Sequence, residues 1–371
     1  MKDEQIFDTA IIGGGLAGLS LAILQAKAGR SVILFEKNDY PQHKVCGEYI
    51  SLESWDFIEK LGVPLSKLDL PIISNLQVSS PRGTFLETKL DLGGFGISRY
   101  LLDKLLADTA LECGVKILTK SLVKNVLKED IASKIILDKQ SFFATHVIGA
   151  YGKRSNLDIV WNRPFIHKNR TSLNQYIGVK YHIKYDFPKD MIALHNFEDG
   201  YCGISAVEEG LHCLCYLTTK KNLKKAGNDI KIMEREILSK NPFLKDIFDS
   251  AEFTWANPEV ISQVSFEKKE IYANGVTMTG DAAGMIAPLC GNGMSMAMHG
   301  AFLIHNELMG KPVKSYADNW KKNFKLRLIV GRTIQRFFGG IWSTELVIRA
   351  LKLNRRLLDY VITLTHGQKF G

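Results

Sequence analysis

The sequence predicts an α/β protein in which a parallel sheet is interleaved with an antiparallel sheet and followed by a helical C-terminal region. A glycine-rich β-α-β pattern occupies residues 8–37, segments of alternating polarity occupy residues 172–219, and the chain after residue 295 has mostly helical periodicity. Alternation is typical of half-buried strands, whereas a period of 3.6 residues is typical of helices. The 371 residues are enough for two domains with a full core.

The β-α-β pattern has the spacing of a Rossmann-like, dinucleotide-binding unit. After a short apolar strand, Gly13, Gly15 and Gly18 fall in G-x-G-x-x-G spacing, and an Ala- and Leu-rich helix follows over residues 16–27. The glycines permit a tight turn, the approach of a pyrophosphate and close packing of helix on strand. The helix N-terminus attracts phosphates through its free N–H groups and its dipole. The alternative is a glycine-rich turn before an ordinary helix.

A second buried strand, over residues 32–35, ends at Glu36. An acid at this point of a dinucleotide-binding unit accepts hydrogen bonds from a ribose. Glu36 therefore favours FAD or NAD over NADP, because its partner must be a free ribose hydroxyl.

The composition, with 46% hydrophobic and 23% charged residues, is ordinary for a globular protein. The formal net charge of +9 favours an acidic ligand, a carrier or a membrane surface, and we expect no nucleic-acid partner. No signal peptide is visible, and no apolar run approaches the ~18 residues that span a bilayer. The six cysteines form neither a C-x-x-C pair nor zinc spacing, which predicts a cytoplasmic protein without a metal site.

The same patterns predict the elements between residues 37 and 280. Helices are predicted at 52–61, 100–113 and 229–239, and a β-hairpin at 76–90. Strands are predicted at 115–118, 123–127, 134–137, 145–149, 253–264 and 275–279, and an antiparallel sheet at 172–219 with turns at 198–200 and 208–210. We assign residues 1–75, 97–160 and 269–305 to a nucleotide-binding domain, 76–96 and 161–268 to a substrate sheet, and 306–371 to a helical region.

A second glycine-rich segment follows the strand at 275–279. It begins with Gly280 and Asp281, and Pro288, Gly291 and Gly293 precede the next helix. A carboxylate here can bind a ribityl hydroxyl, and the helix N-terminus can offer N–H groups to an anionic ring oxygen. The alternative is another glycine-rich strand-to-helix turn.

With Arg99 between them, the two glycine-rich elements resemble the flavoprotein family with the p-hydroxybenzoate hydroxylase fold. Within it the chain is most similar to the geranylgeranyl reductase group, and the likeness extends to about residue 301. The resemblance implies an FAD-dependent oxidoreductase, with NADH or NADPH as a possible electron donor. It implies an FAD-binding set of Gly13, Gly15, Ala17, Gly18, Glu36, Lys37, Lys44, Cys46, Gly47, Arg99, Val123, Gly280, Asp281, Gly291, Gly293 and Met294.

The resemblance also implies individual roles. Glu36 would hold the adenosine ribose, Arg99 the phosphate or adenine side, and Asp281 the ribityl chain, while Gly293 and Met294 would present N–H groups to the pyrimidine edge of the flavin.

Cys46 lies in a segment that resembles the one lying against the isoalloxazine in the reductase group, and it is the candidate for a part in the chemistry. Alternatively, Cys46 fills a loop and the neighbouring Glu48 is a solvated charge. The histidines that could act as acids or bases by type are scattered, and most are expected at the surface or in packing; they are His43, His195, His212 and His299.

Three positions depart from the family pattern. Tyr151 stands where an Asp is usual, which puts the handling of a nicotinamide donor in doubt and predicts slow reduction by free NADH or NADPH. Residues 200–204 carry neither the aromatic YxWxFP-like pattern of lipid reductases nor the WxWxIP of flavin halogenases. Ser295 replaces an Asn that often follows the glycines at the pyrimidine edge.

The reaction type is open on the sequence alone. Oxygenation of an aromatic or polyketide-like compound is slightly favoured over hydride delivery to an isoprenoid C=C, because the lipid-reductase signature is missing. A flavin halogenase and an electron-relay flavoprotein served by a partner reductase are less favoured. We expect a small apolar substrate between the flavin and the sheet.

The C-terminal tract at 345–365 is rich in Leu and Ile, and Arg349, Lys352 and Arg356 recur at helical spacing with Arg355 beside them. A helix packed on its own domain is favoured here over contact with a membrane surface.

Overall fold

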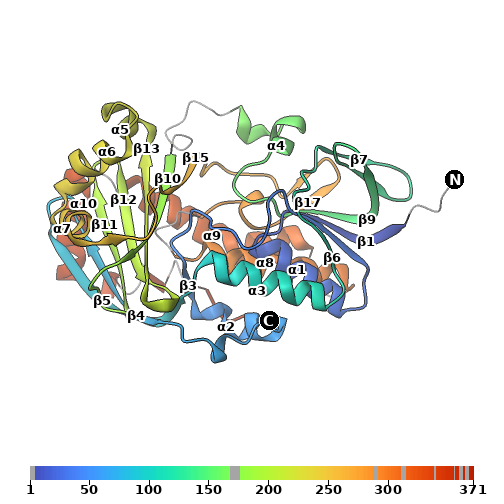
Figure 1. Ribbon diagram of the computed structural model, residues 1–371, viewed down its shortest axis with the longest axis horizontal. Helices are drawn as coiled ribbons and strands as arrows, with labels where there is room; N and C mark the ends of the chain where they lie inside the picture. Colours follow the sequence, from blue (N-terminus) through green and yellow to red (C-terminus); the bar gives the residue numbers. More distant parts are fainter. Residues whose placement is uncertain are drawn as a thin grey trace.

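The computed structural model describes residues 5–167, 176–286, 291–310, 315–337, 340–354, 356–358, 362–363 and 367–371. It is a mixed α/β fold with two sheets, which confirms the predicted fold class. Figure 1 shows the two sheets toward opposite ends of the long axis, with a group of helices between them.

The first sheet is built around the β-α-β unit. It contains β1 (Ile6–Ile12), β2 (Val32–Phe35), β6 (Lys116–Leu118), β7 (Asn125–Lys128), β8 (Ser133–Ile136), β9 (Ser141–Gly149), β16 (Tyr272–Ala273) and β17 (Val276–Met278). The order is β16, β17, β9, β1, β2, β6, and the pairs between β17 and β6 along this path are parallel. β7 and β8 extend β9 as antiparallel strands. Because covered parallel strands are buried on both faces, β2 is apolar at every position.

Helices pack against this sheet in one layer: α1 (Leu16–Lys27), α3 (Arg99–Glu112), α8 (Gly293–Leu308) and α9 (Tyr316–Phe337). α1 contacts both α3 and α8, and α8 contacts α9. The small and apolar residues of α1 allow this close packing, and Leu19, Leu21 and Ile23 are fully buried.

The second sheet is almost wholly antiparallel. It contains β3 (Tyr49–Ser51), β4 (Ile72–Ser79), β5 (Phe85–Gly96), β10 (Tyr176–Lys184), β11 (Met191–Phe197), β12 (Gly200–Ala206), β13 (His212–Thr219), β14 (Glu252–Phe253) and β15 (Glu259–Val264). The order is β14, β10, β13, β12, β11, β4, β5, β3, with β15 also pairing with β10, and β11 with β4 is the parallel pair. The segment after β2 therefore enters this sheet through β3 before the chain returns to α3.

The remaining α-helices are shorter: α2 (Trp55–Leu61), α4 (Asn156–Val160), α5 (Lys220–Lys225), α6 (Ile230–Glu236), α7 (Pro242–Ser250) and α10 (Ile341–Leu353). Met233 of α6 and Leu244 of α7 share one core cluster with Ala193 of β11. Ile348 of α10 shares another cluster with Leu194. Successive strand residues face opposite sides of a sheet, so α6 and α7 cover one face and α10 covers part of the other.

The sequence patterns located most elements closely. α1 and β2 have the predicted bounds, and α3 begins one residue before the predicted helix. The hairpin predicted at 76–90 is longer, because β4 starts at Ile72 and β5 ends at Gly96. The single strand predicted at 253–264 is two strands, β14 and β15, that both pair with β10.

Among the described residues, no helix is both long and apolar enough to cross a bilayer. Pro288 and Arg355, which entered the sequence-based predictions, lie outside the described residues, as does Cys290.

Candidate functional site

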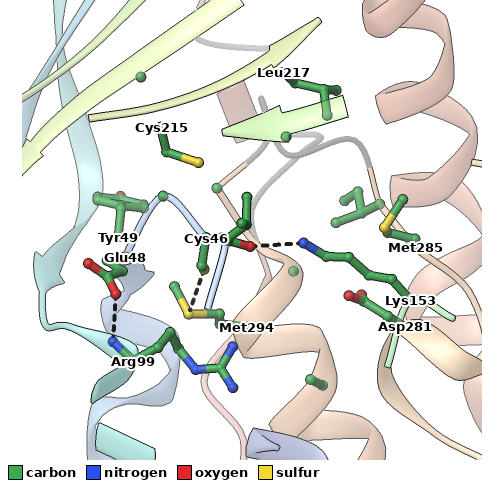
Figure 2. A pocket seen from close by; sticks show the side chains of 18 of the residues that line it. Cys46, Glu48, Tyr49, Arg99, Lys153, Cys215, Leu217, Asp281, Met285 and Met294 are labelled. Carbon is green, nitrogen blue, oxygen red and sulfur yellow. Dashed lines mark hydrogen bonds between the residues drawn. The ribbon is translucent and has the colours of Figure 1, made fainter. Parts of the chain in front are cut away.

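A pocket opens where strands β1, β9 and β17 of the first sheet end, and the second sheet forms its opposite wall (Figure 2). Its volume is about 220 Å³. Ligand sites of open α/β sheets lie outside the carboxyl ends of the strands, which is where this pocket lies. The predicted cofactor residues that line it are Gly15, Ala17, Cys46, Gly47, Arg99, Gly280, Asp281, Gly291, Gly293 and Met294. Those that do not line it are Gly13, Gly18, Glu36, Lys37, Lys44 and Val123.

The N-terminus of α1 faces this pocket. Gly15 is its N-cap residue and supplies no side-chain hydrogen bond, and Gly15, Leu16 and Ala17 line the wall. A Cβ on Gly15 would meet only the Arg99 guanidinium, at 3.7 Å. The first-turn N–H groups and the positive end of the helix dipole are thus available to an anion.

The other two glycines of the motif serve packing. A Cβ on Gly18 would lie 2.0 Å from the Gly13 carbonyl oxygen, and one on Gly13 would lie 2.5 Å from the Ala150 carbonyl oxygen. Such contacts are far below van der Waals distance, so these positions hold α1 and the β9 turn close to β1. Of the three glycines of the motif, Gly15 is the one that lines the pocket.

Glu36 holds the glycine loop in shape. Its Oε2 accepts a hydrogen bond from the Gly14 N–H at 2.8 Å, and its Oε1 accepts one from the Asn38 N–H at 3.0 Å. Each carboxylate oxygen can accept further bonds, so the predicted ribose contact stays a prediction. Lys37 is exposed and Val123 is buried in the core, and neither reaches the pocket.

Arg99 brings a fixed positive charge to the pocket. It is the first residue of α3, which Ser98 caps by accepting a hydrogen bond from the Leu101 N–H. Its guanidinium donates to both oxygens of Asp103 at 2.8 Å, and Lys44 donates to the same carboxylate at 2.8 Å. Burial opposes ionisation of Asp103, but the charges of Arg99 and Lys44 outweigh it and hold its pKa below the usual value. Lys44 therefore acts through Asp103, outside the pocket wall.

The second glycine-rich segment forms the opposite end of the pocket. Gly280 has a φ of +58°, a conformation that favours glycine, and Asp281 follows it at the pocket wall (Figure 2). α8 begins at Gly293, and its N-cap residue Asn292 makes no side-chain cap. A second helix N-terminus thus opens on the same pocket.

Lys269 supports this segment from behind, and the sequence patterns did not indicate it. Its buried ammonium donates to the backbone carbonyls of Lys153 at 3.0 Å and Asp281 at 2.8 Å. Burial lowers the pKa of Lys269 to about 8. Lys269 fixes the relative position of two turns that both line the pocket.

Cys46 lies between the two halves of the site. Its Sγ is 3.5 Å from Met294 Sδ, and its carbonyl oxygen accepts a hydrogen bond from the Cys213 thiol. Cys215 faces the same space from β13 (Figure 2). Burial raises the pKa of Cys215 to about 12 and also raises that of Cys213, so both remain thiols at neutral pH.

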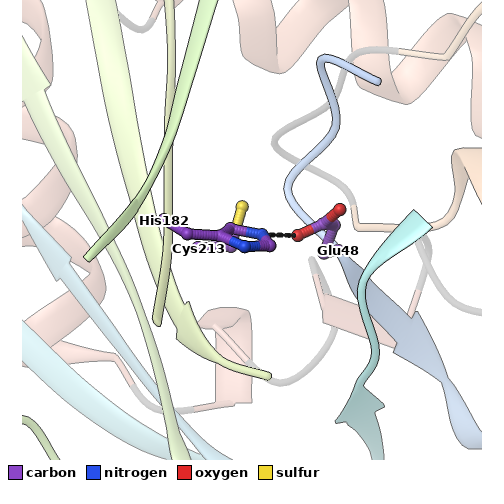
Figure 3. Close-up of side chains that lie close together, drawn as sticks. All are labelled: Glu48, His182 and Cys213. Atoms are coloured by element: carbon purple, nitrogen blue, oxygen red, sulfur yellow. Dashed lines mark hydrogen bonds and ion pairs between the residues drawn. The ribbon is translucent and has the colours of Figure 1, made fainter. Parts of the chain in front are cut away.

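Glu48 is fully buried, so the interpretation of it as a solvated charge is wrong. Its Oε1 accepts hydrogen bonds from the Arg99 N–H at 2.7 Å and from the Lys180 ammonium, and its Oε2 is 2.6 Å from His182 Nε2 (Figure 3). Burial raises its pKa, but the hydrogen bonds and charges of His182 and Lys180 outweigh this and lower it overall. We call Glu48, Lys180 and His182 the Glu48 cluster.

The Glu48 cluster lies beside Cys213, and the three side chains Glu48, His182 and Cys213 are of metal-ligating type (Figure 3). Lys180 already forms an ion pair with the same carboxylate, that of Glu48. A divalent cation would lie close to this ammonium in a buried site, where like charges repel strongly. The cluster is therefore better described as an ionic network than as a metal centre.

The wall formed by the second sheet is uncharged. Its pocket-lining residues are mainly aliphatic or aromatic and include Ile192, Leu194, Tyr201, Leu217 and Val264. Tyr49 adds a polar atom at the base of this wall: its hydroxyl is buried, and no described residue hydrogen-bonds to it.

Tyr151 does not line the pocket. Its hydroxyl donates to Asp158 Oδ1 at 2.9 Å and accepts from Arg163 at 3.0 Å, and its ring packs on Trp161. This geometry favours a packing role over a role at a donor entrance.

The four histidines named from the sequence do not form a common site. His195 is buried beside Ser79, His299 stacks on Phe370, and His212 is buried, which agrees with packing roles; His43 stacks on Tyr100. His182 does not line the pocket, but it contacts Glu48, which does. In the sequence, Lys180 and His182 alternate with apolar residues along β10, which is the ordinary pattern of a half-exposed strand and gave no sign of their burial.

The residues present fit FAD. Two uncapped helix N-termini and the guanidinium of Arg99 suit a pyrophosphate and an anionic ring edge, and the Asp281 carboxylate suits a sugar-alcohol hydroxyl. One continuous pocket extends from the N-terminus of α1 to the N-terminus of α8. The pocket wall formed by the second sheet is apolar.

Comparison with known proteins agrees with the conclusion that the residues fit FAD. The family described as "FAD binding domain" matches residues 7–310. Conditioned medium factor receptor 1 of Dictyostelium discoideum is 24% identical over 90% of this chain and 71% of its own length. Digeranylgeranylglycerophospholipid reductase 1 of Methanococcoides burtonii is 23% identical over 100% of this chain and 94% of its own. A flavin-dependent brominase superposes with a TM-score of 0.76 at 20% identity, covering 99% of this chain and 95% of its own.

The family match spans most of the chain and includes both glycine-rich elements and the second sheet between them. The low identity of the solved brominase shows a common fold, and it leaves the reaction to be argued from the site. The chain belongs to the FAD binding domain family and is an FAD-dependent oxidoreductase.

Proposed function

We propose that this protein reduces a carbon–carbon double bond of a long apolar substrate such as an isoprenoid lipid. The observation that carries the proposal is the uncharged wall of the second sheet facing a cysteine-containing segment on the cofactor side. An apolar chain would bury its surface against Ile192, Leu194 and Leu217 at about 25 cal/mol per Å² without leaving a buried charge unpaired.

Reduced FAD would supply a hydride, that is one proton with two electrons, to such a bond, and the protein must supply the second hydrogen as a proton. Cys46 is placed for this, because its thiol lies in the pocket and is a proton donor. The Glu48 cluster would hold the segment 45–49 in place through the Arg99 N–H and Lys180.

The sequence relatives support this choice, since several curated proteins that match along most of their length are named digeranylgeranylglycerophospholipid reductases. The missing aromatic signature, which favoured oxygenation, lies in β12. There the described wall still provides Tyr201 and Ile204 as apolar contacts.

Oxygenation of an aromatic or polyketide-like compound is the second candidate. The hydroxyl of Tyr49 favours it, because no described residue hydrogen-bonds to this buried group and a polar substrate atom would satisfy it. An isoprenoid hydrocarbon would not.

Product masses separate the two candidates. The FAD-loaded protein, reduced by dithionite without air, is incubated with a geranylgeranyl glycerolipid, and a parallel sample with a polyphenol is exposed to air. Gain of two hydrogens per double bond in the first sample supports reduction. Gain of one oxygen in the second, with the lipid unchanged, would replace the proposal by oxygenation. A Cys46→Ser variant should retain FAD and lose at least tenfold in the rate of lipid reduction.

A further inference from the structure

One face of α10 is apolar and points into solvent. Trp342, Leu346 and Leu353 are 66%, 67% and 90% exposed. They are separated by four and seven residues and therefore lie on one side of a helix. The other side is buried, with Ile348 in a core cluster with the second sheet. Packing within the chain therefore accounts for one face of this helix and leaves the other exposed.

The turn between β4 and β5 contacts α10 beside this face. The Thr84 hydroxyl donates to Glu345 Oε1 at 2.7 Å, and the Arg82 guanidinium lies 3.8 Å from the centre of the Trp342 ring. Phe85, which is 40% exposed, continues the apolar surface onto β5.

The charged side chains around the exposed apolar face of α10 are positive. Arg349 lies on the same face, three residues after Leu346 and four before Leu353, and Lys352 lies beside it on α10. Arg82 flanks this face on the turn, and Arg356 follows the helix as an exposed residue. The acid within α10 is Glu345, which is buried and paired with Arg349. We call Arg82, Phe85, Trp342, Leu346, Arg349, Lys352 and Leu353 the α10 surface.

The α10 surface lies directly behind the apolar wall of the pocket. Ile348, on the buried side of α10, belongs to the same cluster as Leu194, and Leu194 also lines the pocket. Ile192 likewise lines the pocket and packs in the neighbouring cluster around Tyr49. One layer of side chains therefore separates the inside of α10 from the proposed substrate wall.

We propose that the α10 surface docks this protein onto an anionic membrane surface. Exposed Trp and Leu side chains flanked by Arg and Lys suit the boundary between acyl chains and negatively charged headgroups. A large exposed apolar patch on a chain of ordinary composition indicates an interaction site. The positive rim selects an anionic lipid surface over an uncharged apolar partner.

The inference deepens the proposed function, because docking here would bring a membrane-resident substrate to the wall of the pocket. Only this delivery of substrate rests on the proposed function. Vesicle binding is measured without turnover. A failure of docking is therefore distinguishable from a failure of the reduction assay.

The test is co-sedimentation of the FAD-loaded protein with vesicles of phosphatidylcholine alone or with phosphatidylglycerol added. We expect binding to the mixed vesicles, with loss at high salt. Leu346→Ser combined with Leu353→Ser should lower partitioning about tenfold, and Lys352→Glu about fivefold. The matched controls are Leu111→Ser combined with Ile131→Ser, which are 55% and 85% exposed elsewhere, and Lys139→Glu; they should bind like the unchanged protein.

FAD content and melting temperature show that each variant is folded, and sedimentation velocity reports the oligomeric state. Equal binding by the α10 variants and their controls would overturn the proposal. So would a dimer that the Leu346 and Leu353 substitutions dissociate and that shows no vesicle binding, because the surface would then be covered by a second copy.

Discussion

Two of the buried ionic networks among the described residues look alike in composition but differ in position. In the Glu48 cluster, a carboxylate on the segment after β2 meets Lys180 and His182 on β10. In the second network, Arg163 meets Asp158 and Tyr151; we call these three residues the Arg163 cluster. Both bury opposite charges almost completely, yet only the first borders the pocket.

The Arg163 cluster uses its hydrogen bonds to join backbone segments. Besides Asp158, the guanidinium donates to the carbonyl of Ala282 at 3.1 Å and to that of Glu270 at 2.5 Å. The two terminal nitrogens of the guanidinium thus donate to α4, to the Tyr151 hydroxyl and to the segments on either side of β17, and Nε lies 3.6 Å from Glu270 Oε2. A cluster of this kind fixes the fold around the second glycine-rich segment and offers no group to a ligand.

The Glu48 cluster joins the segment after β2 to β10 and, through the Arg99 N–H, to α3, at the place where chemistry is expected. Glu48 itself lines the pocket, as does Cys46 two residues before it in the chain. The comparison shows that a buried ion pair by itself does not mark a site; its position relative to the cofactor pocket does.

The largest effect is expected for Arg163→Met. The substitution leaves Asp158 as a buried charge without its partner and frees two backbone carbonyls, which should lower the free energy of unfolding by about 3–5 kcal/mol. Urea unfolding followed by tryptophan fluorescence measures it. Arg235→Met, in an exposed pair with Glu236, is the control and should change stability by less than about 0.5 kcal/mol.

If the Arg163 cluster serves only the fold, the Arg163→Met molecules that stay folded at low temperature should turn over substrate at the rate of the unchanged protein. A large loss of turnover with unchanged stability would show that the Arg163 cluster also takes part in the site.

Glu48→Gln should cost somewhat less stability, about 2–3 kcal/mol, because Gln can still accept from the Arg99 N–H while Lys180 loses its counter-charge. Turnover should fall at least tenfold as the segment holding Cys46 loses its anchor. Combining Glu48→Gln with Lys180→Met removes both charges, so the two costs should not add. Additive costs would mean that the ion pair contributes nothing.

The pH dependence of this pair has a defined sign. The folded-state pKa of Glu48 lies below its ordinary value of 4.5. Its contribution is therefore fully present above about pH 4.5 and is lost as the pH falls toward the folded-state pKa. The stability difference between the unchanged protein and Glu48→Gln should shrink on acidification, and a difference that stays constant between pH 7 and pH 3 would contradict the assignment.

Local patterns predicted the cofactor side of the molecule well. The bounds of α1 and β2 follow from the glycines, the Ala and Leu run and the apolar strand, all within thirty consecutive residues. The positions of Gly15, Arg99 and Asp281 at one pocket followed from a family resemblance, and the structure brings them together.

The Glu48 cluster could not be predicted in this way. Glu48 and Lys180 are separated by 132 positions, and their contact depends on how the segment after β2 crosses to β10. Polar residues in strands are ordinary at exposed positions, so Lys180 and His182 gave no sign of burial. The same holds for Lys269, whose partners are backbone carbonyls that any sequence supplies.

Asp281 differs from Glu48 and Asp158, the carboxylates of the two ionic networks, because no described residue donates a hydrogen bond to its side chain. Asp281→Ala should remove a charge-assisted hydrogen bond to the ribityl chain of FAD, about 1.5–3 kcal/mol, and weaken FAD binding about ten- to a hundredfold. Titration of the apoprotein with FAD, followed by flavin fluorescence, measures it. An unchanged affinity would assign Asp281 to the shape of the turn alone.

The smallest effect is expected for Tyr151→Phe. The hydroxyl donates to Asp158 and accepts from Arg163, so its loss should cost about 1 kcal/mol of stability. The charge pair between Asp158 and Arg163 remains, which keeps the cost well below that of Arg163→Met.

Tyr151→Phe also tests the sequence-based hypothesis about the electron donor. Reduction of the bound flavin by NADH or NADPH is followed by stopped-flow absorbance without air. Since the hydroxyl points into the Arg163 cluster, the variant should be reduced at the rate of the unchanged protein, whatever that rate is. A severalfold change in the rate, with FAD affinity unaltered, would place Tyr151 at the donor entrance. It would also show that the Arg163 cluster extends its influence to the cofactor, and the distinction between the two ionic networks would then fail.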